Sequence, residues 1–270
     1  MAKIDSTARV ADGAKLGADV FVGPYCIIGP QVTIGDGGHL LAHVSIQGIT
    51  EIGAGAKIQP FASLGSPPQS VHYKGEASRL IVGKNCDIRE AVTMNTGTAG
   101  GRMETRVGDN CMLMTGAHVG HDCIVGNNVI FANNATLGGH VEVEDSVFLG
   151  GLGAVHQNVR IGEGAILAGM VAVRHDVIPF AALAQNGKLG GLNLIGLKRR
   201  GFSRETIHKI RAAYRELFFG EANLSDRLEI VAAKYADEPA VQKIVTFIRQ
   251  AGKRRISTPR SHGAHDGGED

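Results

Sequence analysis

Large apolar residues recur every sixth position over the first two-thirds of the chain. The fifth place of each hexad is usually small or β-branched, as at Val20, Ala56 and Ala117. Two interruptions break the count. The apolar positions are Val10, Leu16, Val22, Ile28, Ile34, Leu40, Ile46, Ile52, Ile58 and Leu64, then Val82, Ile88 and Met94, then Val107, Leu113, Val119, Val125, Phe131, Leu137, Val143, Leu149, Val155, Ile161, Leu167 and Val173.

A period of six predicts a solenoid of short strands and turns. It is neither the 3.6-residue period of a helix nor a plain alternation, but a multiple of two with a corner added. Three hexads close one triangular coil, whose large residues point inward; the many glycines, 38 in 270 residues, let the backbone turn. Stacked coils pair as parallel strands around one apolar axis. We therefore predict a mainly β fold, a parallel β-helix over residues 1–187.

The two interruptions predict loops. They span residues 66–81 (SPPQSVHYKGEASRLI) and 95–106 (NTGTAGGRMETR). Insertions in a solenoid project from its surface and commonly carry binding residues.

After Pro179 the hexads give way to helical spacing, which predicts a C-terminal α-helical domain over residues 188–252. We expect one helix from an N-cap at Ser203 through Phe219, a second opened by Ser225 and a third starting at Pro239. Residues 253–270 (KRRISTPRSHGAHDGGED) are polar, charged and Gly-rich, which predicts a disordered tail.

Charge divides unevenly between the two parts. Residues 188–260 carry 16 Lys and Arg against 7 Asp and Glu, whereas residues 1–187 carry 12 against 16. A basic C-terminal part suits an acidic partner or a phosphate-bearing ligand. No apolar run is long enough for a membrane span and no signal peptide is visible, so we expect a cytoplasmic protein with no membrane span and no nucleic-acid partner.

The four cysteines all occupy the small inward place of their hexads. Cys26, Cys86, Cys111 and Cys123 are therefore expected to fill the core, and neither a zinc site nor a disulfide framework is predicted. We expect no metal and no other cofactor.

Four histidines gather in the later coils: His118, His121, His140 and His156. The steps from His121 to His140 and from His140 to His156 are close to one coil, so the side chains should stack on one side. Neighbouring imidazoles disfavour each other's charge, which keeps at least one ring neutral, as a general base requires.

The residues around these histidines resemble a known family. The matching segments are TGAHVGHDC at 115–123, FANNATLGGHVEV at 131–143, GAVHQ at 153–157, VGPYCIIGP at 22–30, YKGE at 73–76, IREAVTMNTGT at 88–98 and GLKRRGFSRE at 196–205. They are similar to the acyl-carrier-protein-dependent UDP-N-acetylglucosamine acyltransferases that begin lipid A biosynthesis. The resemblance implies left-handed coiling, an exception to the usual right-handed crossover. It also implies a homotrimer and transfer of an (R)-3-hydroxyacyl chain from acyl carrier protein to the 3-position of a UDP-amino sugar.

The resemblance also implies roles for individual residues. His121 would be the general base, Asp122 would orient its ring, and the Gly139 N–H would stabilise the oxyanion. Contacts to the sugar nucleotide, the acyl chain or the carrier protein would come from a larger set. The expected sugar or acyl contacts are His118, His140, His156 and Gln157; the nucleotide contacts are Asn193, Arg199 and Arg200; the end of the acyl groove is at Ile166 and Gly169; the carrier protein would dock on Arg204, Lys209 and Arg211.

The sequence departs from the family at three places. Ile195 stands where an acidic residue near the nucleotide is usual, and Ser70 and His72 replace an Asp and a Lys that touch the sugar. These changes leave open a second acceptor, the 3-amino analogue of the sugar nucleotide, which would give an amide.

Two other classes of protein fit the sequence less well. A zinc-dependent hydratase of the carbonic anhydrase type uses the same solenoid, but it leaves GLKRRGFSR unexplained. A binding solenoid without chemistry would need no His-Asp block.

Overall fold

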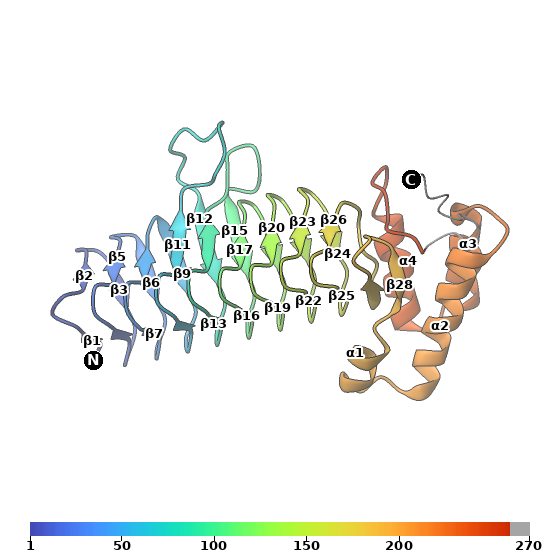
Figure 1. Cartoon of the computed structure of the whole chain (residues 1–270), viewed down its shortest axis with the longest axis horizontal. Coiled ribbons are helices and arrows are strands. Elements are labelled where there is room, and N and C mark those ends of the chain that lie inside the picture. Colours follow the sequence, from blue (N-terminus) through green and yellow to red (C-terminus); the bar gives the residue numbers. More distant parts are fainter. Residues whose placement is uncertain (260–270) are drawn as a thin grey trace, which may run out of the picture.

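The hexads fold into a three-sided prism. The computed structural model describes residues 1–259, and in it the prism runs from the N-terminus to a group of helices at its far end (Figure 1). The predicted mainly β fold, a left-handed parallel β-helix followed by C-terminal helices, is confirmed.

Each side of the prism is one sheet. Sheet 1 contains β1 (Lys3–Ile4), β4 (Phe21–Val22), β7 (His39–Leu40), β10 (Lys57–Ile58), β13 (Asp87–Ile88), β16 (Met112–Leu113), β19 (Ile130–Phe131), β22 (Phe148–Leu149), β25 (Ile166–Leu167), β27 (Ala181–Leu183) and β28 (Leu189–Leu192). Sheet 2 contains β2 (Arg9–Val10), β5 (Ile27–Ile28), β8 (Ser45–Ile46), β11 (Ser63–Ser66), β14 (Thr93–Asn95), β17 (His118–Val119), β20 (Thr136–Leu137), β23 (Ala154–Val155) and β26 (Ala172–Val173). Sheet 3 contains β3 (Lys15–Leu16), β6 (Val32–Ile34), β9 (Ile49–Ile52), β12 (Arg79–Val82), β15 (Glu104–Val107), β18 (Ile124–Val125), β21 (Glu142–Val143) and β24 (Arg160–Ile161).

The register places the apolar residue of each hexad above that of the previous coil. Leu113 pairs with Phe131, and Phe131 with Leu149, along sheet 1. Every apolar hexad position from Val22 to Val173 is buried, whereas Val10 and Leu16 at the open end are half-buried. The four cysteines are buried and free, as expected for core residues.

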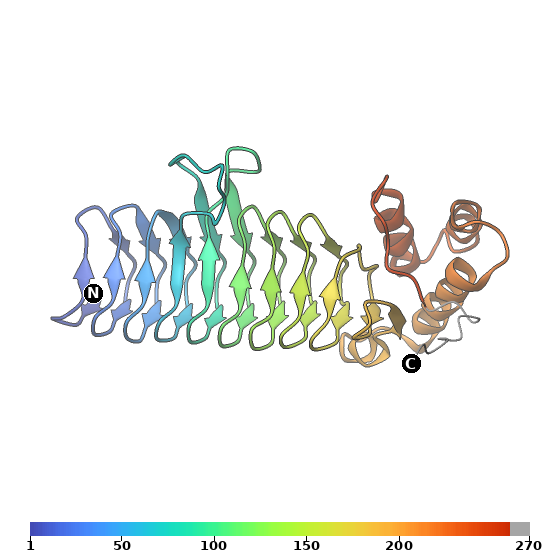
Figure 2. The same ribbon diagram turned by 45° about the horizontal axis from the view of Figure 1, so that its top comes forward.

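Both predicted loops leave the prism at one edge (Figures 1 and 2). The 66–81 loop joins β11 to β12, and the 95–106 loop joins β14 to β15. Because the loops are neighbours in the stack, they stand side by side above the coils that follow.

The C-terminal helices partly match the prediction. They are α1 (Leu194–Arg199), α2 (Arg204–Phe219), α3 (Leu224–Lys234) and α4 (Pro239–Arg249). The Ser203 side chain caps α2, and Pro239 occupies the first turn of α4, as predicted. The second helix begins earlier than predicted, because Asn223, not Ser225, accepts the capping hydrogen bond. The short α1 was not predicted.

Two boundaries also differ from the prediction. β28 pairs antiparallel with β27, so sheet 1 continues to Leu192, past the expected domain boundary at residue 188. The tail was expected to be disordered from residue 253, but Ile256 bridges to Asp176, and Pro259 to Leu189. Residues 260–270 of that predicted tail lie outside the described residues.

A buried ion cluster joins the helices to the end of the prism. The Arg160 guanidinium donates to the Asp176 carboxylate at 2.9 Å and to the Phe247 carbonyl at 2.9 Å, and it lies 4.2 Å from the Phe247 ring centroid. Arg254 donates to the same Asp176 oxygen at 3.2 Å. In the described part of the chain, no helix is both long and apolar enough to cross a membrane.

Candidate active site

Two of the four predicted histidines meet at the corner where sheet 2 turns into sheet 3, next to the two loops. His121 and Asp122 lie between β17 and β18, and His140 lies one coil later. The backbone N–H of His140 donates to the His121 carbonyl at 2.9 Å, and the two rings meet edge to face with centroids 4.9 Å apart. This pair realises the predicted stack.

The other two histidines occupy different register positions. His118 pairs with Thr136 in the sheet, and its Nδ1 lies 2.7 Å from the Thr93 hydroxyl. His156 is exposed, with its Nδ1 3.2 Å from the Gln157 carbonyl. One coil is 18 residues, as the pairing of His118 with Thr136 shows, so steps of 19 and 16 residues do not place the four rings in a single column, although the His121 and His140 rings are in contact.

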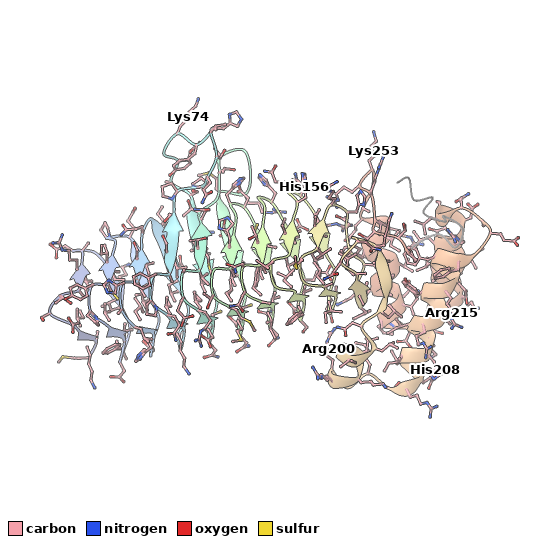
Figure 3. All side chains as sticks on the ribbon, viewed as in Figure 1. Lys74, His156, Arg200, His208, Arg215 and Lys253 are labelled. Carbon is pink, nitrogen blue, oxygen red and sulfur yellow. The ribbon has the colours of Figure 1, made fainter. Side chains whose placement is uncertain are left out.

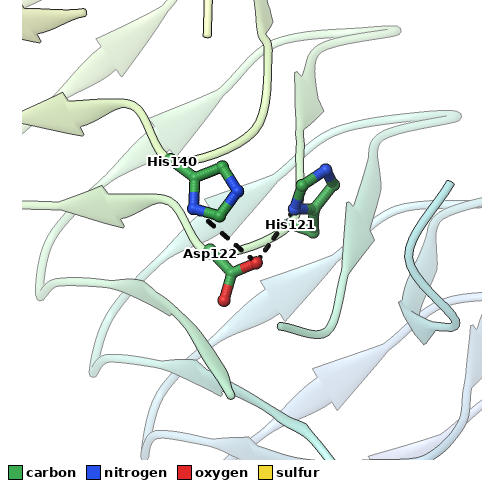
Figure 4. Close-up of side chains that lie close together, drawn as sticks. All are labelled: His121, Asp122 and His140. Atoms are coloured by element: carbon green, nitrogen blue, oxygen red, sulfur yellow. Dashed lines mark hydrogen bonds and ion pairs between the residues drawn. The ribbon is translucent and has the colours of Figure 1, made fainter. Parts of the chain in front are cut away.

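His121 and Asp122 form a catalytic-type dyad (Figure 4). The His121 Nδ1 is 2.9 Å from the Asp122 Oδ2. Because an ionised carboxylate only accepts hydrogen bonds, the Nδ1 carries the proton and donates it, which leaves the Nε2 lone pair free to accept one. The His121 side chain is 14% exposed, so that lone pair can be reached from outside the prism.

Asp122 is wholly buried and is held ionised by hydrogen bonds. Burial alone would raise the pKa of its carboxyl group, but the Thr98 hydroxyl, His121 and the backbone N–H groups of Thr98 and Arg102 all donate to it and lower the pKa below the ordinary value. The carboxylate therefore remains charged at neutral pH beside His121.

Gly139 lies directly beside the His121 ring. A Cβ atom at Gly139 would stand 2.4 Å from the His121 Cε1 and 2.6 Å from the Nε2, closer than atoms can approach. Only glycine fits there. Among the described residues, the Gly139 backbone N–H donates to no other group, which leaves it available to a substrate oxygen.

His118 faces the dyad from β17. Burial lowers the pKa of its imidazole, and the neighbouring His121 lowers it further. A neutral His118 can both donate and accept a hydrogen bond, which suits contact with a sugar hydroxyl.

The side chains of His121, Asp122 and His140 lie close enough together to be compared with a metal site. Single ligand atoms of His121, Asp122 and His140 lie within 4.8 Å of one another. However, both Asp122 oxygens already accept hydrogen bonds, the Oδ1 from two backbone N–H groups and the Oδ2 from the Thr98 hydroxyl and His121. A metal ion would have to displace these donors, so the arrangement fits proton transfer better than metal binding.

The 66–81 loop carries Ser70 and His72 at a turn. The Ser70 hydroxyl accepts from the His72 backbone N–H at 3.3 Å, and the His72 side chain is exposed. Lys74 follows at the tip of this loop, on the same side of the prism as His156 (Figure 3). No contact is recorded between Ser70 or His72 and the dyad.

The expected nucleotide residues lie on the opposite side of the prism. Asn193 caps α1, because its Oδ1 accepts from the Gly196 N–H at 2.9 Å and its Nδ2 donates to the Gly164 carbonyl. Arg199 is exposed, and Arg200 forms an ion pair with Glu163. Within one chain, Arg200 and His156 point away from each other on opposite sides (Figure 3).

The expected carrier-protein residues separate into two groups. Arg204 and Arg211 line a cavity of about 500 Å³ with Lys198 and His208. Lys209 does not line it, because its ammonium pairs with Glu205 at 2.9 Å and Glu238 at 3.5 Å.

The two residues expected at the end of the acyl groove lie close together on the later coils. Ile166 is half-buried on β25, where its side chain follows that of Phe148 on β22. Gly169 lies in the next turn, and a Cβ atom there would meet the Gly151 carbonyl oxygen at 3.1 Å.

The sequence analysis missed Thr98 and Arg102. Both lie in the 95–106 loop and donate to Asp122, from 24 and 20 residues earlier in the chain. The signal that could have found them is the glycine pattern of this loop. Gly97 and Gly101 each pass too close to the Asp122 carboxylate for any side chain.

Comparisons with known proteins agree with this geometry. A profile of bacterial transferase hexapeptide repeats matches residues 13–48 and 104–139, which defines the prism as that of a hexapeptide transferase. A second profile, described as UDP-N-acetylglucosamine O-acyltransferase, domain 2, matches residues 176–257.

Whole-chain relatives narrow the class to one family. An acyl-[acyl-carrier-protein]–UDP-N-acetylglucosamine O-acyltransferase of Azorhizobium caulinodans is 61% identical over 260 residues, 96% of either chain. The Brucella ovis protein of the same name is 48% identical over 98% of this chain and 95% of its own. The crystal structure of the Francisella novicida UDP-N-acetylglucosamine acyltransferase superimposes with a TM-score of 0.91 at 33% identity, covering 96% of this chain and 95% of that one. The chain belongs to the UDP-N-acetylglucosamine O-acyltransferase family.

Proposed function

We propose that this chain transfers a 3-hydroxyacyl group from acyl carrier protein to the 3-hydroxyl of UDP-N-acetylglucosamine, the first step of lipid A biosynthesis. The observation that carries the proposal is the His121–Asp122 dyad with the unshielded Gly139 N–H beside it. This is the set of groups that acyl transfer needs: a base for the nucleophile and a donor for the oxyanion.

The reaction follows from the free atoms of the site. The His121 Nε2 accepts the proton of the 3-hydroxyl as that oxygen attacks the thioester carbonyl carbon. The carbonyl oxygen gains negative charge and accepts the hydrogen bond from the Gly139 N–H. When the tetrahedral intermediate collapses, the C–S bond breaks and the imidazolium returns its proton to the leaving thiolate.

Asp122 stabilises the imidazolium without taking its proton. Its pKa lies below the ordinary value, so the carboxylate stays charged and accepts from the His121 Nδ1–H throughout the cycle. His118 and His140 are close enough to the dyad to contact the sugar, and His156 and Gln157 follow on the next coil.

The hydroxyl acceptor is preferred to its amine analogue. The change to Ser70 and His72 alters the loop and leaves the dyad intact, and the relatives across 93–98% of this chain are named O-acyltransferases. An ester is accordingly the expected product.

The carrier protein would dock at the basic cavity of α1 and α2. Arg204 and Arg211, with Lys198 and His208, place positive charge around an apolar floor of Leu194, Phe202 and Ile207. Carrier proteins are acidic, so this surface offers complementary charge. Lys209 would contribute less, because Glu205 and Glu238 already neutralise it.

A homotrimer would complete the site. In one chain Arg200 lies on the opposite side of the prism from His156 (Figure 3), and His156 stands at the same corner as His121, between the next strands of sheets 2 and 3. The nucleotide contacts expected of Arg199 and Arg200 would therefore not reach a substrate bound at His121 of the same chain. A neighbouring copy would supply them across a cleft. Mixing His121→Ala and Arg199→Ala chains should restore activity if the site is shared, whereas an active monomer in sedimentation equilibrium would contradict the trimer.

The function is tested by incubating the protein with UDP-N-acetylglucosamine and 3-hydroxyacyl carrier protein. We expect a UDP-sugar product whose new acyl chain is released by mild alkali, as an ester is. An alkali-stable product formed only from the 3-amino nucleotide would overturn the choice of acceptor, and no product from either nucleotide would overturn the function.

A further inference from the structure

The 95–106 loop closes over the buried side of the dyad. The Thr98 hydroxyl donates to the Asp122 Oδ2 at 2.6 Å, and this is the same oxygen that accepts from His121. The Thr98 and Arg102 backbone N–H groups donate to the Oδ1 at 3.1 and 2.6 Å. Three of these four donors come from the 95–106 loop, and the fourth is His121.

Further contacts fix the loop to the corner. The Arg102 guanidinium donates to the Asp122 carbonyl at 3.0 Å and pairs with Glu142 on β21. The Asp122 backbone N–H donates to the Thr105 hydroxyl at 2.8 Å. Loop and corner are therefore joined through both the backbone and the side chain of Asp122.

The loop can come this close because of two glycines, Gly97 and Gly101, and a Cβ atom at Gly97 would already lie 2.9 Å from the Asp122 Oδ1. A Cβ atom at Gly101 would lie 2.3–2.5 Å from the carboxylate carbon and oxygens of Asp122. At the neighbouring Gly100 a Cβ atom would meet nothing within 4 Å. The close approach is therefore local to Gly97 and Gly101, with the closest contacts at Gly101, and is not a general property of this Gly-rich loop.

We propose that Thr98, seated by Gly101 and Arg102, is a positioning residue for the reaction: it fixes which Asp122 oxygen faces His121 and how much negative charge that oxygen presents to the imidazolium. The inference rests on the proposed role of His121 as base. Thr98 touches neither substrate nor the His121 ring, and it acts through Asp122 alone.

The physical reason is competition for one oxygen. A hydroxyl that donates to the Asp122 Oδ2 withdraws part of its charge and makes it a weaker acceptor for the His121 Nδ1–H. The charged or titratable groups that face this carboxylate are His121, Arg102 and, at 3.9 Å, His140. Thr98 thus limits how strongly the imidazolium is stabilised, so that the proton can be returned to the leaving group.

Two variants of Thr98 separate this positioning role from a simple packing role. In Thr98→Val the Oδ2 loses its hydroxyl donor and becomes a stronger acceptor, so the acid limb of the kcat/KM profile should move to higher pH. On that limb kcat/KM should fall about twofold to tenfold, as for the loss of one net hydrogen bond. Thr98→Ser keeps the hydroxyl and should restore the wild-type profile.

Gly101→Ala should move the acid limb of the kcat/KM profile in the direction opposite to Thr98→Val. The added methyl group would push the carboxylate away from His121, so the acid limb should move to lower pH and kcat should fall by about 10²-fold or more. Gly100→Ala is the matched control and should leave the profile unchanged.

A measurement without substrate keeps this test independent of the proposed function. The proton between the His121 Nδ1 and Asp122 can be followed by NMR as a downfield ¹H resonance. It should move further downfield in Thr98→Val, stay in place in Thr98→Ser and Gly100→Ala, and broaden or vanish in Gly101→Ala. An unmoved resonance and an unmoved acid limb in Thr98→Val would overturn the positioning role. An inactive wild-type protein would overturn the proposed function alone.

Discussion

At the scale of single residues, the site depends on one side chain that is missing. Gly139 leaves space for the His121 ring, and its backbone N–H donates to no other group among the described residues. A base and an oxyanion donor are thereby held within one turn of the solenoid. His140, the residue after Gly139, has a left-handed backbone angle, and so do Asp122 and Asn158 at the same corner of the adjacent coils. The corner geometry is therefore general, and the pairing of His121 with Gly139 is specific to these coils.

Gly139→Ala should therefore disable the enzyme without unfolding it. The new Cβ atom would displace the His121 ring while the backbone N–H remains, and we expect kcat to fall by about 10²–10⁴-fold, as when general-base catalysis is lost. Circular dichroism melting checks the fold. Gly151→Ala is the control, because a Cβ atom there lies 3.3 Å from its nearest neighbour. Equal rates for both variants would contradict the close contact of Gly139 with the His121 ring.

The sequence predicted the base but not what holds its partner. The coils are predictable because every coil needs a large apolar residue at the same inward position, so the hexad period is visible in the sequence. The base is predictable because His121 and Asp122 are adjacent in one continuous segment. The contacts of Thr98 and Arg102 with Asp122 depend on a loop that closes in three dimensions, which no periodicity encodes. Asn193 shows the same limit, since its capping of α1 was visible only once that helix was known.

At the scale of elements, the position of the C-terminal helices depends on the ion cluster of Arg160, Asp176 and Arg254 at the end of the prism. Asp176 is 1% exposed and Arg160 is 7% exposed, so neither charge is compensated by water. The cluster fixes α4 and residues 253–257 against β24 and thereby sets where α1 and α2 stand. The sequence alone does not predict this ion cluster, because Arg160 and Asp176 occupy ordinary hexad and turn positions.

Asp176→Ala should loosen this end while the prism remains folded. Removing one partner leaves the Arg160 charge buried, which typically costs about 3–5 kcal/mol. We expect the amide protons of α4 to exchange faster by a corresponding factor, with sheet 1 strands β10 to β19 unchanged. Asp237→Ala, an exposed position on the same domain, is the control. Unchanged protection of α4 would show that the cluster contributes no stability.

The later coils should set the length of acyl chain that the enzyme accepts. Gly169→Met would place a long side chain near Ile166 with only a small shift of the Gly151 carbonyl, which lies 3.1 Å from the new Cβ atom. Preference among 3-hydroxyacyl carrier proteins should move to shorter chains, at about 0.8 kcal/mol for each methylene no longer buried. Gly100→Met, at an open position, should not change it. The same chain preference in both variants would place the end of the groove elsewhere.

At the scale of the whole molecule, the proposed reaction and the proposed carrier-protein docking involve different parts of the chain. The proposed active site lies on the prism beside the two loops, and the basic helices carry Arg200 and His208 on the side of the prism opposite His156 (Figure 3). A carrier protein docked on the helices must deliver its thioester to a dyad corner, which a neighbouring copy can present to it.

Charge reversal at Arg204 and Arg211 together should raise KM for the acyl carrier protein by about tenfold at low salt. The difference should shrink as salt screens the surface. Arg215→Glu, on the same helix but outside the cavity, is the control. A KM that does not change, at low and high salt alike, would move the docking surface off this cavity.

The most direct test of the account is the pH dependence of kcat/KM for the wild type and His121→Ala, with UDP-N-acetylglucosamine and 3-hydroxyacyl carrier protein. The Asp122 pKa is lowered, so this group is charged above its folded pKa and loses its contribution only as the pH falls through that value. The wild-type acid limb therefore reports protonation of the base. We predict that His121→Ala lowers kcat/KM by about 10²–10⁴-fold and abolishes this limb, with the fold retained. A His121→Ala protein with near-normal rates and the same acid limb would contradict the assignment of the base and the mechanism built on it.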